Sequence, residues 1–331
     1  MVMSLLNTRD TTNSKTRSVR LLRNNASIIL IYTIILIVIG IAFFVNENFR
    51  SPSNLINILR QSIILGLIAI GQSMIALTGG LDMSVAQVAR IVGLTVASIF
   101  AISGSNPTLI IPLIILGLLI GGTIGLLNGI LVTRTHANPF IITLGIASIL
   151  RGVNLAISST PIRGIPKPYL HIYDYKIGIV PLNVLVMILV WILVYIFTTR
   201  TRNGRALFAV GGSERVARLS GINYNKTLIM AYIICSIFAA MTGLFLLSRT
   251  GVGDPSAAEG MDFQSIVAVA LGGISLYGGK GSIIGTMGGV LLLATLSNVF
   301  NLLQVNIYYQ QLFLGLIVLI TVAAYKSPRS S

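Results

Sequence analysis

A glycine-rich turn is the stretch of this chain that comes nearest to a catalytic motif. Gly278–Gly281, with the sequence GGKG, looks like a phosphate-binding loop. The match fails because Ile274 stands where that loop needs its first glycine, and because Lys280 is followed by glycine instead of Ser or Thr. We therefore interpret the segment as a tight turn and predict that the chain has no ATP site of its own.

The side chains that usually act as bases, nucleophiles or metal ligands are isolated from one another. His136 and His171 fall in separate predicted loops, and the single cysteine, Cys235, lies within an apolar stretch. They supply no catalytic pair, no cysteine zinc site and no disulfide within the chain. We therefore predict no catalytic residue, no metal and no cofactor, and the chain is not expected to be an enzyme.

Ionisable side chains also occur beside long apolar stretches, where they are costly and often functional. Asp82 precedes Met83-Ser84-Val85, so its carboxylate either contacts substrate or caps the helix that follows, and Asp262 is placed similarly. We favour the cap, which is compatible with a half-helix that lines a pathway. Arg90 follows Asp82 by two turns, so both could share a helix face. Arg90 must face a polar interior, a carboxylate or water, or else its side chain must extend to the membrane–water interface. The candidates for a translocation pathway are Asp82, Ser84, Gln87, Arg90 and Asp262.

A long polar interruption occurs at Gly204–Asn223, GRALFAVGGSERVARLSGIN. Ser213 can cap a helix, Glu214 suits its first turn, and Gly221 can end it in a left-handed conformation. The predicted helix, Glu214–Ser220, is too short to be stable alone in water, so we expect it to pack on something. We favour a docking surface over a loop that only anchors the topology. Its candidate residues are Gly204, Arg205, Gly211, Gly212, Ser213, Glu214, Arg215, Arg218, Leu219 and Gly221.

The composition is that of a protein that crosses a membrane many times. Hydrophobic residues make up 54% of the 331 residues and charged residues only 9%, with a mean hydropathy of +0.90. Soluble domains carry about 25% charged residues, so these few charges could not cover a water-exposed surface. The net charge of +15 comes from basic residues in short loops, without a basic stripe and interleaved aromatics. This pattern favours a positive-inside topology over nucleic-acid binding.

Ten apolar segments predict an all-α, polytopic membrane protein, because a bilayer core needs about 20 apolar residues per helix. The eighth segment is short and flanked by glycine, which indicates a half-helix. We divide the chain into a tail at 1–26, a membrane domain at 27–325 with a polar loop at 199–226, and a tail at 326–331. The first segment is interpreted as a retained span. The segments are 27–45, 59–77, 84–103, 109–131, 139–158, 179–198, 227–248, 262–276, 282–301 and 307–324.

The distribution of Lys and Arg predicts the orientation. With the N-terminus in the cytoplasm, the inner parts hold about three times as many Lys and Arg residues as the outer loops. The positive-inside rule therefore places both termini and the loop at 199–226 in the cytoplasm.

A faint internal repeat runs through the sequence. Gly80-Leu81-Asp82 and Gly260-Met261-Asp262 each open an apolar segment, and the sequences GTIG at 122–125 and GTMG at 285–288 follow them. Five segments separate the two copies, so they would face opposite ways across the membrane. Such inverted repeats are common in transporters, with the pathway between the halves.

Four blocks of sequence resemble the ribose-type permeases of bacterial ABC importers. Leu77–Val88, LTGGLDMSVAQV, resembles the family signature LTGGIDLSVG, and Asn138–Gly152, NPFIITLGIASILRG, resembles PFIVTLGTxxxxRG. Gly204–Asn223 is similar to GRxxxAxGGNxxAARLSGI, and Ala268–Gly289, AVALGGISLYGGKGSIIGTMGG, to AVVLGGTSLxGGxGxxxGTxxG. The blocks occur in the same order and span most of the chain.

This resemblance implies a multi-pass permease subunit in the bacterial cytoplasmic membrane, surrounded by lipid, that imports a monosaccharide. It implies a homodimer, or a heterodimer with a sister permease, that binds two ATPase subunits and receives sugar from a periplasmic or lipid-anchored binding protein. The helix after Ser213 would be the coupling element that docks on the ATPase. Ala86, Gln87, Arg90 and Ser213 depart from the family pattern. A substrate other than a neutral pentose, or a partner carboxylate for Arg90, would explain the more polar helix.

Two other transport classes stay open at this point. A secondary transporter driven by an ion gradient would need several paired intramembrane carboxylates, whereas the chain offers mainly Asp82. A branched-chain amino-acid permease of an ABC importer is the milder alternative, although the four blocks match the sugar group better.

Overall fold

The computed structural model describes residues 26–135, 137–178 and 180–324. Apart from Ala26, the predicted tails at 1–26 and 326–331 lie outside these residues, as does His136. The helices in chain order are α2 (Ala26–Val45), η1 (Glu47–Arg50), α3 (Pro52–Leu77), α4 (Val85–Ile102), η2 (Pro107–Leu109), α5 (Ile110–Thr135), α6 (Pro139–Ile157), α7 (Lys167–Asp174), α8 (Leu182–Arg200), α9 (Arg202–Gly212), α10 (Glu214–Leu219), α11 (Tyr224–Thr250), α12 (Met261–Leu271), α13 (Ile283–Leu302) and α14 (Ile307–Ala324).

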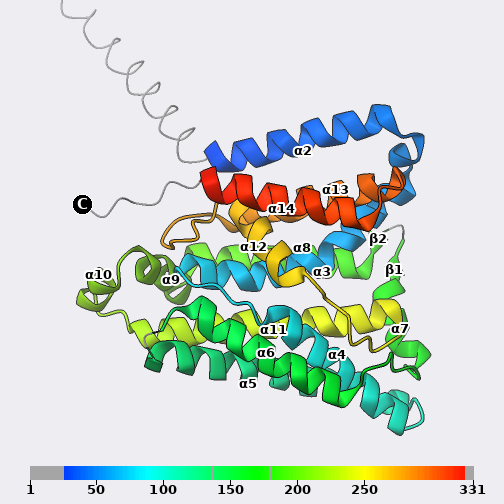
Figure 1. Ribbon diagram of the computed structural model, residues 1–331, viewed down its shortest axis with the longest axis horizontal. Helices are drawn as coiled ribbons and strands as arrows, with labels where there is room; N and C mark the ends of the chain where they lie inside the picture. The colour runs from blue at the N-terminus through cyan, green and yellow to red at the C-terminus, as the bar shows by residue number, and fades with distance from the viewer. Residues whose placement is uncertain (1–25, 136, 179, 325–331) are drawn as a thin grey trace, which may run out of the picture.

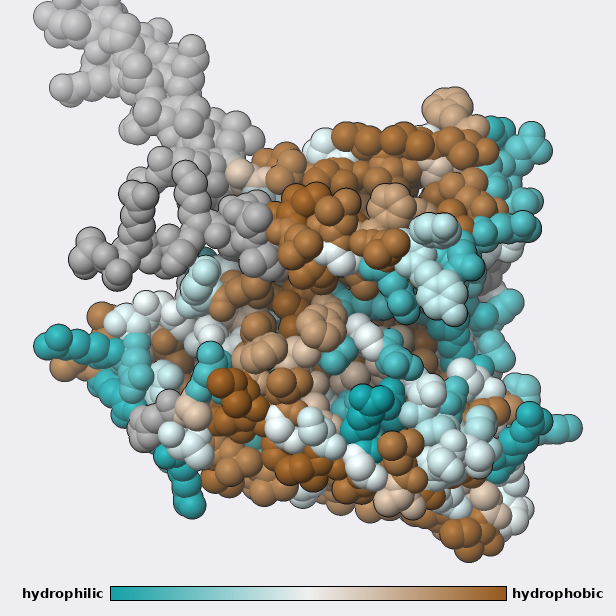
Figure 2. All heavy atoms as spheres, viewed as in Figure 1, coloured by the Kyte–Doolittle hydropathy of each residue, from teal (hydrophilic) through white to brown (hydrophobic). Residues whose placement is uncertain are grey.

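The all-α prediction is confirmed. Strand structure in the described part of the chain is limited to a small antiparallel hairpin of β1 (Lys176–Ile177) and β2 (Val180–Pro181), and one bridge between Ile162 and Gly253. The long helices lie side by side in one bundle, with α10 at one end and α7 at the other (Figure 1). Hydrophobic residues cover much of the flanks of the bundle, and hydrophilic residues gather at its two ends (Figure 2). This distribution suits a protein whose flanks face lipid.

Each of the ten predicted segments is a helix in the structure. Eight helices are long and apolar enough to cross a membrane, and α12 and the apolar part of α14 are shorter. The predicted half-helix is α12, with 11 residues. Sequence reasoning missed the short helix α7, whose first turn contains a proline, because eight residues between polar loops carry too weak a pattern.

Two helices, α3 and α11, form the centre of the bundle. Every residue of α3 from Ser62 to Leu77 is buried, and α11 packs against α3, α4 and α5. Small residues bring these helices together: a Cβ on Gly243 of α11 would overlap the Ala89 carbonyl of α4. Because lipid is as apolar as leucine, such close backbone contact is the usual source of association between membrane helices.

The packing agrees with the predicted inverted repeat. Helices α4 and α5 pack on α11, and α12 and α13 pack on α3; α6 contacts α4 as α14 contacts α12. The two central helices run in opposite directions, since α3 ends beside α9 whereas α11 begins beside α10 (Figure 1). The GTIG and GTMG sequences fall in the equivalent helices α5 and α13.

Candidate functional site

Asp82 lies in the non-helical break between α3 and α4 and is completely buried. Its Oδ1 accepts hydrogen bonds from the Ser84 amide at 2.7 Å and from the Ser84 hydroxyl at 2.6 Å. Asn128 of α5 donates to the Ser84 hydroxyl oxygen at 2.8 Å. The carboxylate thus binds an amide at the start of α4, while the N-cap position itself belongs to Ser84.

The break is held by side chains from three further helices. With its side-chain amide oriented to satisfy both groups, Gln72 of α3 donates to the Asp82 carbonyl at 3.3 Å and accepts from the Asp82 amide at 3.1 Å. The Met83 amide donates to the hydroxyl of Thr143, from α6, at 3.1 Å. Non-helical backbone at membrane depth is tolerated where protein satisfies its polar groups in this way. In this conformation Asp82 joins helices and does not line the cavities described below.

Arg90 is buried on α4 and belongs to a separate polar cluster. Its Nε donates to the Ala257 carbonyl at 3.0 Å, and its Nη1 donates to Gln87 Oε1 at 3.4 Å. Asn154 of α6 donates to the same Gln87 oxygen at 3.1 Å. The helix face that Arg90 was predicted to share with Asp82 does not form, because α4 begins only at Val85. That prediction is wrong.

The contact with Ala257 ties α4 to the segment at 251–260, which connects α11 to α12. A small cavity of about 80 Å³ beside Arg90 is lined by this segment, including Asp254. Asp262 lies farther on, in the first turn of α12, where the N-cap is Gly260 with φ +75° and no side chain caps the helix. The predicted N-cap position of Asp262 is therefore wrong, because the left-handed Gly260 takes that position and α12 begins at Met261, two residues earlier than a cap at Asp262 requires.

A cavity of about 420 Å³ lies between α3, α12, α13 and α14 and also reaches the end of α11. It occupies the half of the bundle nearer to α7. Sequence reasoning missed this site: none of the five pathway candidates lines it, although Gln264, two residues after Asp262, does. Its polar lining residues are Gln61, Arg249, Glu259, Gln264, Ser297, Asn301, Gln310 and Gln311.

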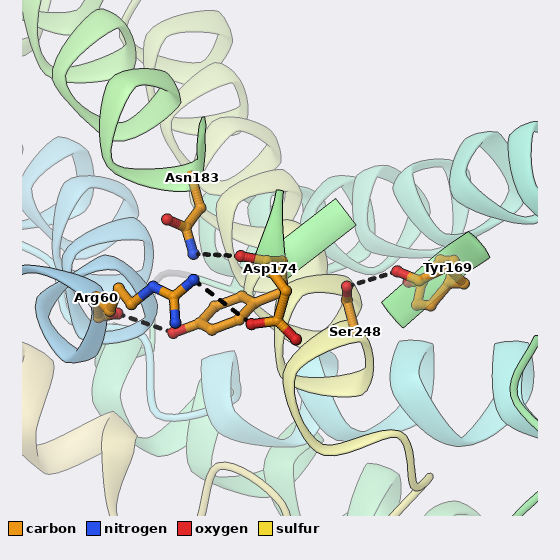
Figure 3. Close-up of polar contacts among 6 residues, drawn as sticks. Arg60, Tyr169, Asp174, Asn183 and Ser248 are labelled. Carbon is orange, nitrogen blue, oxygen red and sulfur yellow. Dashed lines mark hydrogen bonds and ion pairs between the residues drawn. The ribbon is translucent and has the colours of Figure 1, made fainter. Parts of the chain in front are cut away.

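Polar contacts of helix α7 reach residues beside this cavity. Tyr173 donates from its hydroxyl to the Arg60 carbonyl at 3.1 Å (Figure 3), beside the lining residue Gln61. Arg60 also contacts Asp174 at 3.5 Å, and the guanidinium of Arg249 lies 6.0 Å from the centre of the Tyr173 ring. Burial raises the pKa of Tyr173, so its hydroxyl stays protonated and keeps donating at neutral pH.

Further contacts in Figure 3 attach α7 to α8 and α11. Asn183 donates to the Tyr173 carbonyl at 3.0 Å, and Ser248 donates to the Tyr169 carbonyl at 2.7 Å. The Tyr169 hydroxyl donates to the Leu244 carbonyl at 3.0 Å. The short helix is thereby fixed to three long ones.

At the opposite end, α10 projects from the bundle (Figure 1). The Ser213 hydroxyl accepts from the Val216 amide at 3.3 Å, and Gly221 has φ +76°. The predicted cap and the left-handed ending are therefore confirmed, and the helix stops one residue before the predicted Ser220. Leu219 is 81% exposed and Val216 61%.

Charged side chains occupy the rest of α10. Glu214 and Arg218 form an ion pair at 2.8 Å, and the Arg218 guanidinium lies 5.0 Å from the centre of the Tyr224 ring. Arg215 is exposed. The helix thus presents two apolar side chains next to basic ones, without a covering element among the described residues.

The loop around α10 contains a second helix that was not predicted. Gly204, Arg205, Gly211 and Gly212 all lie in α9, which the glycine content had hidden. The last turn of α9 packs closely on the ends of other helices. A Cβ on Gly211 would overlap the Leu77 carbonyl oxygen and come within 2.6 Å of the Gly279 nitrogen. The Gly279 amide donates to that same carbonyl at 2.9 Å.

Comparison with known proteins gives the family. Residues 54–322 match the family model described as the permease component of branched-chain amino acid transport systems. The chain belongs to this permease family. The match begins in α3 and ends in α14, so it includes both halves of the predicted inverted repeat.

Curated relatives of the permease are named for sugars. It is 37% identical to the ribose import permease of Bacillus subtilis over 86% of its own length and 88% of the relative's. It is 33% identical to the D-allose transport system permease of Escherichia coli, over 84% of each chain. The fructose import permease of Rhizobium meliloti is 30% identical, over 91% of this chain and 86% of the relative. No solved structure matches the chain.

Proposed function

We propose that this permease imports a monosaccharide across the bacterial cytoplasmic membrane. The named relatives with sugar substrates support this substrate class more directly than the branched-chain amino acids of the family description. Following the distribution of Lys and Arg, the termini and the α10 end face the cytoplasm. The α7 end then faces outward, toward a periplasmic or lipid-anchored sugar-binding protein.

Separate ATPase subunits drive the import by docking on α10. The observation that supports this step is the isolated apolar pair on α10: Val216 and Leu219 are exposed on a helix too short to be stable without packing. Through Gly211, α9 connects α10 to the end of α3 and to the turn at 278–281 between α12 and α13. An ATPase that moves α10 would therefore push on the central helix α3 and on the helices packed against it. The permease works as a homodimer or with a sister permease, so that two ATPase subunits act together.

Replacing Leu219 tests the docking surface. Fully burying a leucine side chain contributes about 1.5–3 kcal/mol, so Leu219→Ala should lose about 1–2 kcal/mol of binding. This corresponds to a Kd for the ATPase subunit that is roughly 5- to 30-fold higher. Leu219→Met keeps most of the apolar area and should bind within about 3-fold of wild type. Affinity is measured with purified permease in nanodiscs, and thermal unfolding of both variants should be unchanged.

Uptake into proteoliposomes separates the proposal from its rival. The complete complex should take up sugar only when ATP is present on the side of the membrane that corresponds to the cytoplasm. An uncoupler should leave the initial rate of sugar uptake unchanged. Uptake by the permease alone under an ion gradient would instead establish a secondary transporter. In the binding experiment, an unaltered Kd for the ATPase subunit with Leu219→Ala would show that α10 is not the docking element.

A further inference from the structure

We infer that the 420 Å³ cavity between α3, α12, α13 and α14 is a binding site for a neutral, polyhydroxylated solute within a single permease subunit. This inference rests on the proposed function and adds a location and a set of recognising residues. The volume falls within the roughly 300–1,000 Å³ of small-molecule sites.

Four polar side chains converge on the cavity, one from each surrounding helix. They are Gln61 of α3, Gln264 of α12, Ser297 of α13 and Gln311 of α14. None of these four side chains makes a hydrogen bond to any part of the chain that the structure describes. By contrast, Gln310 is occupied, because its amide donates to Asn301 at 3.1 Å and to the Val305 carbonyl at 3.0 Å.

Unpaired amides in apolar helices need a reason. In a membrane-spanning segment each such group would be costly in lipid or in a dry interface, so it is expected to face water or a ligand. A polar side chain farther along α3 is paired: Ser73 bonds to the Ala69 carbonyl at 2.7 Å and to Thr286 at 3.1 Å. Single unpaired atoms also occur away from the cavity, such as the buried hydroxyls of Tyr232 and Ser236 in α11. At the cavity, by contrast, four unpaired side chains come together from four helices.

The chemistry of this set fits hydroxyl groups. A carboxamide offers both donors and acceptors, and a hydroxyl offers one donor and two acceptor lone pairs, so three glutamines and a serine can bind several hydroxyls at once. Apolar residues of the same cavity, including Leu65, Leu293 and Ile317, provide a surface for the C–H groups of a sugar ring. Arg249 and Glu259 also line the cavity but form no ion pair with each other. They would suit a zwitterionic amino acid, which makes that ligand the rival to be tested.

The test compares uptake by proteoliposomes that contain the complete transporter with its binding protein. The substitutions are Gln61→Met and Gln264→Met, singly and together, because methionine keeps the length of the side chain and removes its hydrogen bonds. Ser148→Ala, on the exposed face of α6, is the control. D-Ribose, D-allose, D-fructose and leucine are offered as labelled substrates, and saturation-transfer NMR measures their direct binding to the permease in nanodiscs.

We expect each single variant to reduce the rate of sugar uptake by about 3- to 10-fold and the double variant by more, since each loses a net hydrogen bond. The variants should keep ATP hydrolysis and thermal stability, and the double variant should lose the sugar NMR signal. If the wild-type transporter takes up sugar and the double variant shows the same uptake and the same NMR signal, the inference is overturned. The proposed function stays intact in that case. Uptake of leucine alone, or of none of these substrates, would overturn both.

Discussion

The contact that joins α9 to the rest of the bundle allows a matched test with two neighbouring glycines. Gly211 faces the Leu77 carbonyl and the Gly279 amide so closely that there is no room for a Cβ. The next residue, Gly212, has open space within 4 Å of the Cβ position. The substitutions Gly211→Ala and Gly212→Ala therefore add the same methyl group to the same helix turn with different consequences.

The size of the effect follows from the distances. Real Cβ atoms essentially never approach other heavy atoms within 3.0 Å, whereas the new carbon at 211 would lie 2.6 Å from the Gly279 nitrogen and closer still to the Leu77 oxygen. The obstructing atoms are backbone, so α9 must shift instead of a side chain. Overpacking of this kind costs about 1–3 kcal/mol, and the loss of the Gly279–Leu77 hydrogen bond would add about 1 kcal/mol.

Thermal unfolding of the purified permease measures the first consequence. Gly211→Ala should lower the Tm by roughly 4 °C or more, whereas Gly212→Ala should change it by no more than about 2 °C. The second consequence is measured in the complete transporter as sugar molecules imported per ATP hydrolysed. This ratio should fall for Gly211→Ala and stay constant for Gly212→Ala. Equal Tm values and equal coupling ratios for the two variants would refute the reasoning that α9 transmits movement through this contact.

Two further substitutions test the packing around the break and the central helices. Asp82→Ala removes the acceptor for the buried Ser84 amide and hydroxyl, so we expect a loss of about 2–5 kcal/mol of stability, seen as poor recovery of folded protein by size-exclusion chromatography. Recovery equal to wild type would show that this carboxylate is not structural. Gly243→Ala would force a methyl into the Ala89 carbonyl and should lower the Tm, whereas Gly145→Ala has open space and should leave it equal or slightly higher. A Gly243→Ala protein as stable as the Gly145→Ala protein would contradict the close contact.

Several features of this permease could be predicted because they depend on nearby residues only. A run of about 20 apolar residues forms a helix in a membrane wherever it is placed, since its backbone must bond to itself. The ten segments were therefore found, including the short α12. The cap at Ser213 and the left-handed ending at Gly221 are likewise local, and so the structure reproduces them.

Other features depended on partners far away in the chain. Asp82 and Arg90 looked like neighbours on one helix, but the backbone between Leu77 and Val85 is held open by Gln72 and Thr143, which no local pattern indicates. Helix α9 was hidden because Gly211 is a poor helix former in isolation. Its lack of a side chain becomes an advantage only against the Leu77 carbonyl.

The sequence by itself determined which segments cross the membrane, because hydrophobicity and backbone hydrogen bonding act over a few consecutive residues. It also determined the family, through four blocks of residues in a fixed order. Only the tertiary structure decided which polar side chains share a cavity. Gln61, Gln264, Ser297 and Gln311 lie on four different helices, and each reads as an ordinary polar residue in its own segment. Their convergence depends on how α12 and α13 pack on α3 and how α14 packs on α12, which is set by contacts between residues distant in the chain.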